Sequence, residues 1–376
     1  MHAMVDGQDQ LSTLKQLIKE TPSGSVAFHL SSDPLPMEEL IQELLTNGHR
    51  GKIEIEPSQE VVLTWHSEPP SSLHSVFSLP KCAKGVQTKS AVTYALNQGR
   101  LGDKLLVYFH AKWIAYQYNL PFLYTPFDQA ELFHLSIRDQ ELSSDFQFEN
   151  VVRIGHLDQI DLFGPATLYA IPFFPETLFM REMRRRFDRP YFRVDWTDPQ
   201  FRKEMIACLT PREKVKTIKL PSNCMTVGVH VRRGEGVDGE AVFQTFPLKF
   251  PNDAYYVRQL ETIAKIFKDK SIYVHVFTDV LHPLQIVEAL KSKLRGYPLK
   301  FGCRILGNGP GVHILDDFCS MQKCDCLIIS QSNFSLLASK LRDYAIVIMP
   351  THATQINGQY EIDGIEIAFN PALKTP

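Results

Sequence analysis

The stretch GVHVRRGEGVDGE, at positions 228–240, decides the fold expected for this chain. It places an alternating apolar segment directly before two arginines, a glycine and a cluster of carboxylates. A parallel strand in an α/β sheet is usually covered on both faces and reads as nearly continuous apolar sequence, so a His and an Arg inside one need a reason. Either this strand lies at the edge of its sheet, or its end meets a ligand.

Around this stretch, apolar runs alternate regularly with helical segments. The expected strands are 225–231, 272–278, 303–306, 326–330 and 345–350, and the expected helices lie near 253–268, 283–294, 316–324 and 333–342. Such a βαβαβ series predicts a parallel sheet with right-handed crossovers. In these sheets ligands bind beyond the carboxyl ends of the strands, where the charged end of the opening stretch is expected to lie.

The upstream half contains a second, shorter α/β pattern. It predicts a strand at 90–96, a helix at 105–119 and a short strand directly after that helix. The intervening NQGRLGDK, at 97–104, is interpreted from its spacing alone as a tight strand-to-helix turn, because glycine serves where φ must be positive. The expected domains are an α/β N-terminal extension at 1–88, which ends in a Pro- and Ser-rich linker or wrapping arm, an N-terminal Rossmann-like domain at 89–200 and a C-terminal Rossmann-like domain at 201–376.

Composition excludes several classes of protein. The chain has 376 residues with 40 basic and 42 acidic side chains, a net charge of −2, so no global field favours nucleic acid or an anionic membrane. The N-terminus lacks a signal-peptide core, and no run approaches the roughly 20 apolar residues of a membrane span. Seven cysteines, an odd number, argue against a disulfide framework. We therefore expect a soluble, cytoplasmic protein, and no metal site, since Cys324 and Cys326 have no second Cys/His pair at zinc-finger spacing.

The opening stretch supplies the first candidate site. His230 and Arg232 are two residues apart and therefore share one face of the strand, and Arg233 follows at the strand end. An arginine fork matches phosphate oxygens and keeps its charge, which favours a diphosphate ligand. The alternative is a structural ion pair with Glu235 or Asp238.

The second candidate lies in GVHILDDFCSMQKCDCLIISQSNFSLLASKL, at 311–341. Asp316 and Asp317 fall at a helix start, where carboxylates stabilise the helix dipole. Hydroxyl and amide side chains follow the strand CLIIS and open the next helix, whose free amides can bind an anion or simply be capped by serine. These residues are Ser330, Ser332, Asn333 and Ser335.

Several common catalytic motifs are missing from the sequence. There is no GxxxxGK[ST] phosphate loop, no GxSxG elbow and no HExxH. There is also no Asp-x-Asp, which metal-dependent sugar-nucleotide enzymes use to hold a diphosphate through a cation. If a diphosphate binds here, arginine is expected to take the place of the metal.

Three motifs, in order, resemble the GDP-fucose fucosyltransferases, the α1,2-, α1,6- and protein O-fucosyltransferase group. HVRRGEGVDGE is similar to that group's His-x-Arg-Arg motif, with the rhizobial nodulation α1,6-fucosyltransferases nearest in pattern. GRLGDKLLVYFHAKWIAYQYNLPF resembles its N-terminal Gly-x-x-Gly-Asn/Asp loop and helix, and DDFCSMQKCDCLIISQSNFS resembles its C-terminal donor motif. The resemblance covers roughly residues 90–350 and implies a metal-independent, inverting enzyme of the GT-B type, in which two Rossmann-like domains face each other across a cleft.

The resemblance also implies roles for individual residues. Arg232 would contact the β-phosphate of GDP-fucose, supported by Arg233 and His230. Gly102 lies in the matching N-terminal loop and would border the donor, while Asp103 or Glu235 would serve as a base for the acceptor hydroxyl. Glu235 stands where many relatives have Asp, and Asp103 where the protein O-fucosyl enzymes have Asn. The remaining donor residues would be Ser332, Asn333 and Ser335 at the phosphates, and Asp316 or Asp317 on the guanine or ribose side.

Two other functions remain open at this point. One is a non-catalytic relative that binds a nucleotide sugar or a glycan, and the other is a transferase of the same fold with a different nucleotide sugar. No cofactor is expected; the expected partners are the donor and a glycan or protein acceptor. The loops at 99–104 and 230–233 are expected to border the same cleft, because both follow strand ends.

Overall fold

A computed structural model of the chain describes residues 9–29, 37–58, 60–67, 90–96, 99–154, 157–172, 194–234, 246–305 and 314–371. Two compact units make up the chain. The first consists of Met1–Ser71 together with Lys216–Pro376, and the second of Ser72–Val215. No helix among the described ranges is long and apolar enough to cross a membrane.

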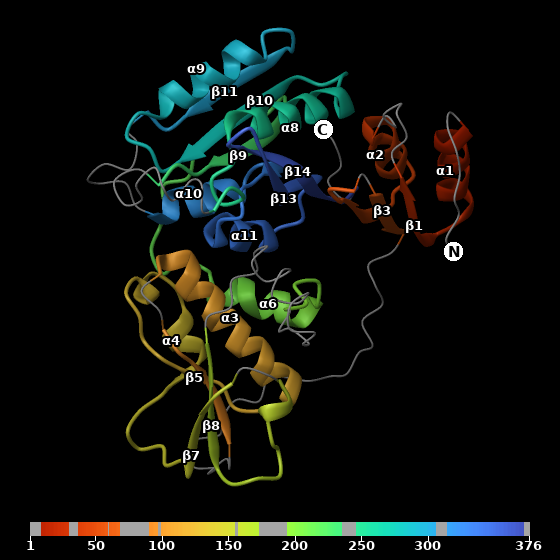
Figure 1. The fold of residues 1–376 in the computed structure, drawn as a ribbon. Coiled ribbons are helices and arrows are strands. Elements are labelled where there is room, and N and C mark those ends of the chain that lie inside the picture. Colours follow the sequence, from red (N-terminus) through yellow and green to blue (C-terminus); the bar gives the residue numbers. More distant parts are fainter. Residues whose placement is uncertain are drawn as a thin grey trace. The chain divides into compact units, whose positions relative to one another are not determined.

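The first unit is built on a nine-stranded sheet in the order β1-β3-β2-β14-β13-β12-β9-β10-β11 (Figure 1). Its strands are β1 (Ser23–His29), β2 (Arg50–Ile55), β3 (Glu60–His66), β9 (Met225–Val231), β10 (Ile272–Thr278), β11 (Leu299–Cys303), β12 (Cys326–Ile328), β13 (Ile346–Ile356) and β14 (Gln359–Phe369). Its described helices are α1 (Asp9–Glu20), α2 (Met37–Thr46), α8 (Asp253–Ile266), α9 (Pro283–Lys293), α10 (Ile314–Met321) and α11 (Asn333–Lys340).

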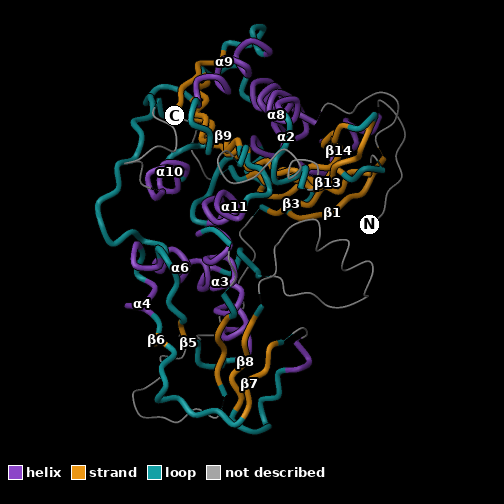
Figure 2. The backbone as a smooth tube through the Cα atoms, turned by 60° about the vertical axis from the view of Figure 1, so that its left-hand side comes forward, coloured by secondary structure: helices purple, strands orange, loops and turns teal. Residues whose placement is uncertain are grey.

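The strands from β9 to β13 form a parallel, doubly wound sheet. Each is parallel to its neighbours in the order β11-β10-β9-β12-β13. The chain passes from β9 to β10 and β11 on one side, and returns to β12 and β13 on the other, which is the strand order of the Rossmann fold. Helices cover both faces, and two views agree that α8 and α11 lie on opposite sides of β9 (Figures 1 and 2). The α/β fold class predicted from the sequence is therefore confirmed.

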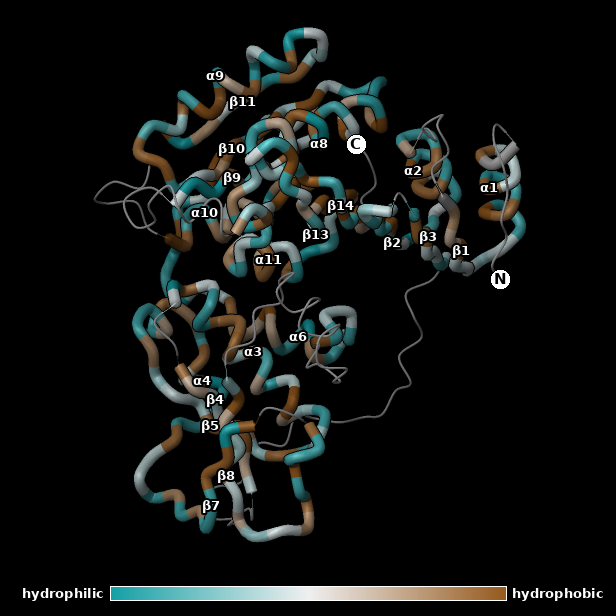
Figure 3. Tube along the Cα trace, in the orientation of Figure 1, coloured by the Kyte–Doolittle hydropathy of each residue, from teal (hydrophilic) through white to brown (hydrophobic). Residues whose placement is uncertain are grey.

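Burial explains the alternating pattern of the central strands. All seven residues of β9 are buried, including the valines at 227, 229 and 231 on one face. Along β9 and β10, strongly hydrophobic residues on one face alternate with mostly smaller or more polar residues on the other (Figure 3). Thr226, His230, His275 and Thr278 in these strands are buried too and only Tyr273 is partly exposed, so the strands are not half-exposed edge strands. The unusual charge of the opening stretch must therefore be explained by the end of β9.

Residues from both ends of the chain share this sheet. Strand β2 pairs antiparallel with β14, with Ile53 opposite Ile367. Strands β3 and β1 extend the sheet beyond β2, again antiparallel. Helix α2 packs against α8, and Lys265 of α8 forms an ion pair of 3.0 Å with Glu38 of α2. Residues 1–71, which the sequence analysis assigned to a separate extension, thus belong to the same compact unit as the C-terminal strands.

The second unit is a smaller α/β unit. Its described elements are strands β4 (Ala91–Tyr94), β5 (Leu123–Tyr124), β6 (Gln140–Glu141), β7 (Asn150–Arg153) and β8 (Thr167–Ile171), helices α3 (Leu101–Tyr118), α4 (Leu135–Arg138) and α6 (Pro199–Cys208), and two 3-10 turns, η1 (Ala130–Leu132) and η2 (Leu157–Gln159). Strands β4, β8 and β7 form a parallel sheet, and β5 pairs with β6. Helix α3 packs against this sheet and is buried along most of its length. How this unit faces the first, and hence the cleft of the GT-B type, stays a prediction.

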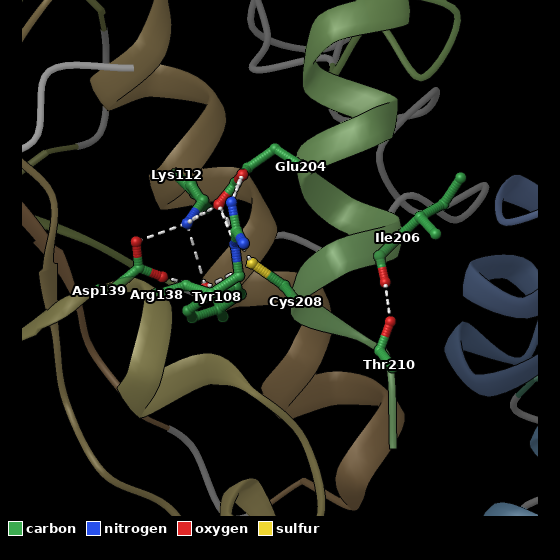
Figure 4. Close-up of polar contacts among 8 residues, drawn as sticks. All are labelled: Tyr108, Lys112, Arg138, Asp139, Glu204, Ile206, Cys208 and Thr210. Carbon is green, nitrogen blue, oxygen red and sulfur yellow. Dashed lines mark hydrogen bonds and ion pairs between the residues drawn. The ribbon is translucent and has the colours of Figure 1, made fainter. Parts of the chain in front are cut away.

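A buried polar cluster joins α3, α4 and α6 in this unit (Figure 4). Lys112 of α3 contacts Asp139 at 2.5 Å and Glu204 at 3.1 Å, and its side chain is only 3% exposed. Arg138 forms a second ion pair with Glu204. Burial raises the pKa of Glu204, but the hydrogen bond from Arg138 and the charge of Lys112 outweigh it and lower the pKa to about 2. Glu204 is therefore ionised in the folded chain at neutral pH.

Two predicted element positions are wrong. The third strand of the series is β11 at Leu299–Cys303, several residues before the predicted 303–306. Its sequence LKFGC is only partly buried and lacks the apolar run that the prediction relied on. Helix α3 begins at Leu101 rather than at 105, so that Gly102 and Asp103 lie in its first turn and not in a preceding loop. The reason is that the Asp103 carboxylate accepts a hydrogen bond from the Arg100 amide, which stabilises a helix start before the apolar stretch.

Candidate functional site

The ends of β9 and β12 form the switch point of the doubly wound sheet. These strands are neighbours, with Ile328 opposite Val229, yet the chain leaves them toward opposite sides of the sheet. Loops that diverge in this way leave room between them, which is where ligands bind in open α/β sheets. The segment after β9 carries Arg232 and Arg233, and the segment after β12 leads into the N-terminus of α11.

His230 is buried near the end of β9. Its ring centroid lies 6.1 Å from that of Phe334 in α11. The Nδ1 atom is buried and has no hydrogen-bond partner among the residues that the structure describes. Burial, together with the charge of Arg232, lowers the pKa of His230 to about 4 although Asp279 opposes the shift. The ring is thus neutral at ordinary pH and keeps one buried nitrogen available for a ligand.

The two arginines after β9 lie in different surroundings. The Arg233 guanidinium contacts an Asp253 carboxylate oxygen at 2.5 Å and the Pro251 carbonyl at 2.6 Å. The backbone amides of Arg233 and Gly234 donate to Asp279 at 2.6 and 2.9 Å. Arg233 therefore has a structural role, because it forms an ion pair with Asp253. Glu235 and Asp238 lie outside the described residues.

Arg232 is held beside an aromatic ring. Its guanidinium carbon lies 5.7 Å from the ring centroid of Phe250, and the residue is only partly buried. Stacking on an aromatic face leaves the in-plane N–H donors of a guanidinium directed outward. Arg232 is thus positioned at the switch point, beside Phe250 rather than beside Asp253 and Pro251, which hold Arg233.

The N-terminus of α11 supplies the opposite side of the site. Ser332 is the N-cap residue, but its side chain makes no capping hydrogen bond. The Ser330 hydroxyl is fully buried and has no hydrogen-bond partner among the described residues. Ser335 donates to the Ser332 carbonyl at 3.2 Å, and Asn333 is buried beside it. The Ser332 side chain is thus not a cap in this structure, and the anion site stays a prediction.

Asp316 and Asp317 are tied to Arg304, which follows β11. The Arg304 guanidinium contacts Asp316 at 3.2 Å and Asp317 at 2.6 Å. Asp316 also accepts a hydrogen bond from the Lys216 amide at 3.1 Å. Burial raises the pKa of Asp317, although Arg304 opposes the shift. In the described chain both carboxylates hold α10 to its surroundings, and their predicted contact with guanine or ribose stays a prediction.

The candidates from the upstream motif lie in the second unit. Asp103 lies in the first turn of α3 and accepts a hydrogen bond from the amide of the N-cap residue Arg100 at 3.2 Å. Gly102 is buried in the same turn. Asp103 is thus a helix-capping residue in this structure, and Glu235, the other predicted base, lies outside the described residues. Their roles in catalysis stay predictions.

Sequence reasoning missed one polar residue at the site. Thr278 ends β10, pairs in register with Val231 of β9, and has a buried Oγ1 without a hydrogen-bond partner among the described residues. The available signal was the change from the apolar run IYVHVF to Thr and Asp, which parallels the change at the end of β9. Three neighbouring strands, β12, β9 and β10, therefore each bring an unsatisfied buried polar atom toward their carboxyl ends.

His275 allows the buried histidines of this sheet to be tested by pH. It lies in β10 with Nδ1 3.2 Å from the Tyr273 hydroxyl, and burial together with the charge of Arg304 lowers its pKa to about 4. His230 has a similarly lowered pKa, so between about pH 6.5 and 4 the unfolded chain binds more protons than the folded one. Above pH 6.5 these two histidines should not change the free energy of unfolding. Below pH 6.5 they should lower it, by about 2 kcal/mol per histidine at pH 5.

Urea unfolding at pH 7 and pH 5 checks this expectation. His275→Leu removes one of the two groups and should lose less stability on acidification than the wild type. His282→Gln is the control, because His282 is exposed and its loss should not change the difference. Equal losses in the wild type and His275→Leu would contradict the expectation.

Comparison with known proteins gives similarity at the level of structure only. No family model and no curated protein matches the chain. Several solved structures are similar, among them the following three. A variant of FUT1 from Arabidopsis thaliana in complex with GDP has 13% identity and a TM-score of 0.45, covering 73% of this chain and 73% of that one. POFUT1 in complex with GDP-fucose has 12% identity and a TM-score of 0.37, covering 70% and 96%. The fucosyltransferase NodZ from Bradyrhizobium has 15% identity and a TM-score of 0.37, covering 72% and 100%. These are GDP-fucose fucosyltransferases, the group whose motifs the sequence resembles.

Proposed function

We propose that the chain is a glycosyltransferase that binds a nucleoside diphosphate sugar at the switch point of its first unit. One observation carries the proposal. At a single strand edge the fold gathers Arg232, a neutral His230 with a buried free nitrogen, the buried hydroxyl of Ser330 and an N-terminal helix turn that Ser332 does not cap. The His230 nitrogen and the Ser330 hydroxyl are buried without a partner among the described residues, which costs stability unless a ligand satisfies them.

The chemistry of this set suits a diphosphate. The amides of α11 carry the positive end of a helix dipole, which favours phosphate oxygens. Arg232 can bind two such oxygens at once through its planar fork. Neutral His230 can donate one hydrogen bond without adding charge. The site thus offers oriented donors on both sides of the gap between β9 and β12.

The sequence motifs supply the finer part of the proposal. Their resemblance to the GDP-fucose fucosyltransferases supports GDP-fucose as the donor and a glycan or protein hydroxyl as the acceptor. The proposed reaction is a metal-independent, inverting displacement at the anomeric carbon. Breaking the bond to the β-phosphate builds negative charge on the departing oxygen, and preorganised donors at that oxygen usually make the largest contribution to rate.

GDP should stabilise the protein without any added metal. The reason is that a ligand bound to the folded state alone shifts the unfolding equilibrium, by about 2.7 kcal/mol at a concentration 100 times its dissociation constant. Thermal unfolding would be followed with GDP, UDP and dTDP, each with and without EDTA. GDP is expected to give the largest shift, unchanged by EDTA.

Two results would count against the proposal. If GDP does not shift the melting temperature, the proposed donor site is wrong. If EDTA abolishes the shift, binding depends on a metal ion. Incubation with GDP-fucose then separates an enzyme from a binding protein. Stabilisation by GDP without hydrolysis or transfer of fucose would indicate the non-catalytic relative.

A further inference from the structure

A histidine, a carboxylate and a threonine are linked on the hairpin of β13 and β14. His352 Nδ1 lies 2.7 Å from one carboxylate oxygen of Asp363, and the Thr354 hydroxyl donates to the other at 2.5 Å. Burial raises the pKa of Asp363, but the hydrogen bonds from Thr354 and His352 outweigh it and the pKa is lowered. The carboxylate is therefore ionised and fixes the ring of His352.

The strand ladder is irregular at this histidine. Register shifts occur on both sides of His352, between Pro350 and His352 and between His352 and Ala353. Gly364 lies opposite, and a Cβ atom there would be 2.6 Å from the Cβ of His352. Bulges redirect side chains and are frequent next to active sites. The backbone on both strands is thus arranged around the His352 side chain.

His352 lies on the same face of the sheet as His230. Val229, Ile328, Ile348 and Ile367 are successive partners across four strands and share one face. His230 follows Val229, and Gly364 is three residues before Ile367 in β14, so alternation places both on the other face. Since Gly364 pairs with His352, that histidine also lies on this face, where Phe334 of α11 lies against His230.

His352 also lies beyond the carboxyl end of the sheet, next to the switch point. The Gln331 side chain, just before the N-cap of α11, donates to the Pro350 carbonyl at 2.9 Å. Strand β13 is two strands from β9, about 10 Å across the sheet. Arg232, directly after β9, and His352, in β13, thus belong to segments on either side of β12 and of the segment that leads into α11.

We propose that His352 is the general base that deprotonates the acceptor hydroxyl, and that Asp363 is its positioning residue; this rests on the function proposed above. Because Asp363 holds Nδ1–H, the lone pair of Nε2 is left to accept a proton, and Nε2 has no partner among the described residues. The acceptor oxygen bonds to the anomeric carbon as the bond to the β-phosphate oxygen breaks. The electron pair of that bond stays with GDP, and the hydroxyl proton passes to Nε2 and then to water.

The test uses two acceptors that need no specificity, water and azide, with GDP-fucose as donor. Water must lose a proton when it attacks, whereas azide carries none. His352→Ala should therefore lower fucose release to water about 10²- to 10⁴-fold while forming fucosyl azide at the wild-type rate. Asp363→Asn should show the same split to a smaller degree. Gln355→Ala, an exposed position on the same hairpin, should change neither reaction.

GDP binding separates this proposal from the proposed function. His352→Ala is expected to bind GDP within about twofold of the wild type. If His352→Ala reacts with water and with azide at the wild-type rates, His352 is not the general base. If both rates fall in parallel, His352 instead has a role in the fold or in donor binding, and the proposal is again overturned. A wild type that binds GDP but reacts with neither acceptor overturns it as well. A wild type that does not bind GDP refutes the proposed function itself.

Discussion

Arg232→Ala is expected to abolish sugar transfer while the protein keeps a melting temperature close to that of the wild type. Removing one preorganised donor to developing negative charge typically lowers the rate about 10²- to 10³-fold. Arg232 lies at the end of β9 with its guanidinium stacked on Phe250, so its loss removes a donor at the switch point. Arg232→Lys should restore little, because lysine keeps the charge but not the bidentate geometry.

Arg233→Ala provides the matched control. This neighbour holds Asp253 and the Pro251 carbonyl, and loss of charged hydrogen bonds of this kind costs about 1.5–3 kcal/mol. Turnover and urea unfolding measured on the same samples should therefore separate the two arginines. A variant at position 232 that unfolds early, yet transfers normally at low temperature, would show that Arg232 is the structural residue and remove the main catalytic claim.

Lys112→Met is expected to have the largest effect on stability, at about 3–5 kcal/mol. The substitution leaves Asp139, whose side chain is 10% exposed, without its cationic partner inside the second unit. Glu204 retains Arg138, so the cost arises mainly at Asp139. The double variant Lys112→Met/Asp139→Asn removes the uncompensated charge and should recover part of the loss.

Urea unfolding of the wild type, both single variants and the double variant checks this expectation. Lys15→Met is the control, because the side chains of the ion pair of Lys15 with Glu39 are 28% and 56% exposed and exposed pairs contribute at most about 1 kcal/mol. If Lys112→Met costs no more than Lys15→Met, the cluster in Figure 4 does not hold the helices together.

Much of the first unit could be predicted from the sequence because its signals are local. Alternation within β9 and β10, and the switch to helical periodicity after each strand, are properties of short windows. Strand β11 was misplaced because its residues are partly exposed and carry no clear apolar run. The pairing of β2 with β14 had no local signal, since it depends on residues at opposite ends of the chain.

The candidate site was predictable to the same extent. The change from apolar to polar residues at strand ends singled out His230, Arg232 and Ser332 as candidates, and the topology of an α/β sheet brings such strand ends together; their roles stay predictions. Ion-pair partners could not be assigned in this way. Asp253, the partner of Arg233, lies 20 residues further along the chain, at the start of α8. Which carboxylate pairs with which arginine depends on tertiary packing, not on local sequence.

The junction of β2 with β14 has a consequence for the order of events during synthesis. The ribosome releases β2 first, then the whole second unit, and only much later β14. Until β14 emerges, one edge of the N-terminal strands has no partner, and exposed strand edges readily pair with other chains. The inserted unit, with its own helices and sheet, can fold meanwhile. Nascent chains arrested before β14 should therefore depend on chaperones for the N-terminal strands but not for the inserted unit.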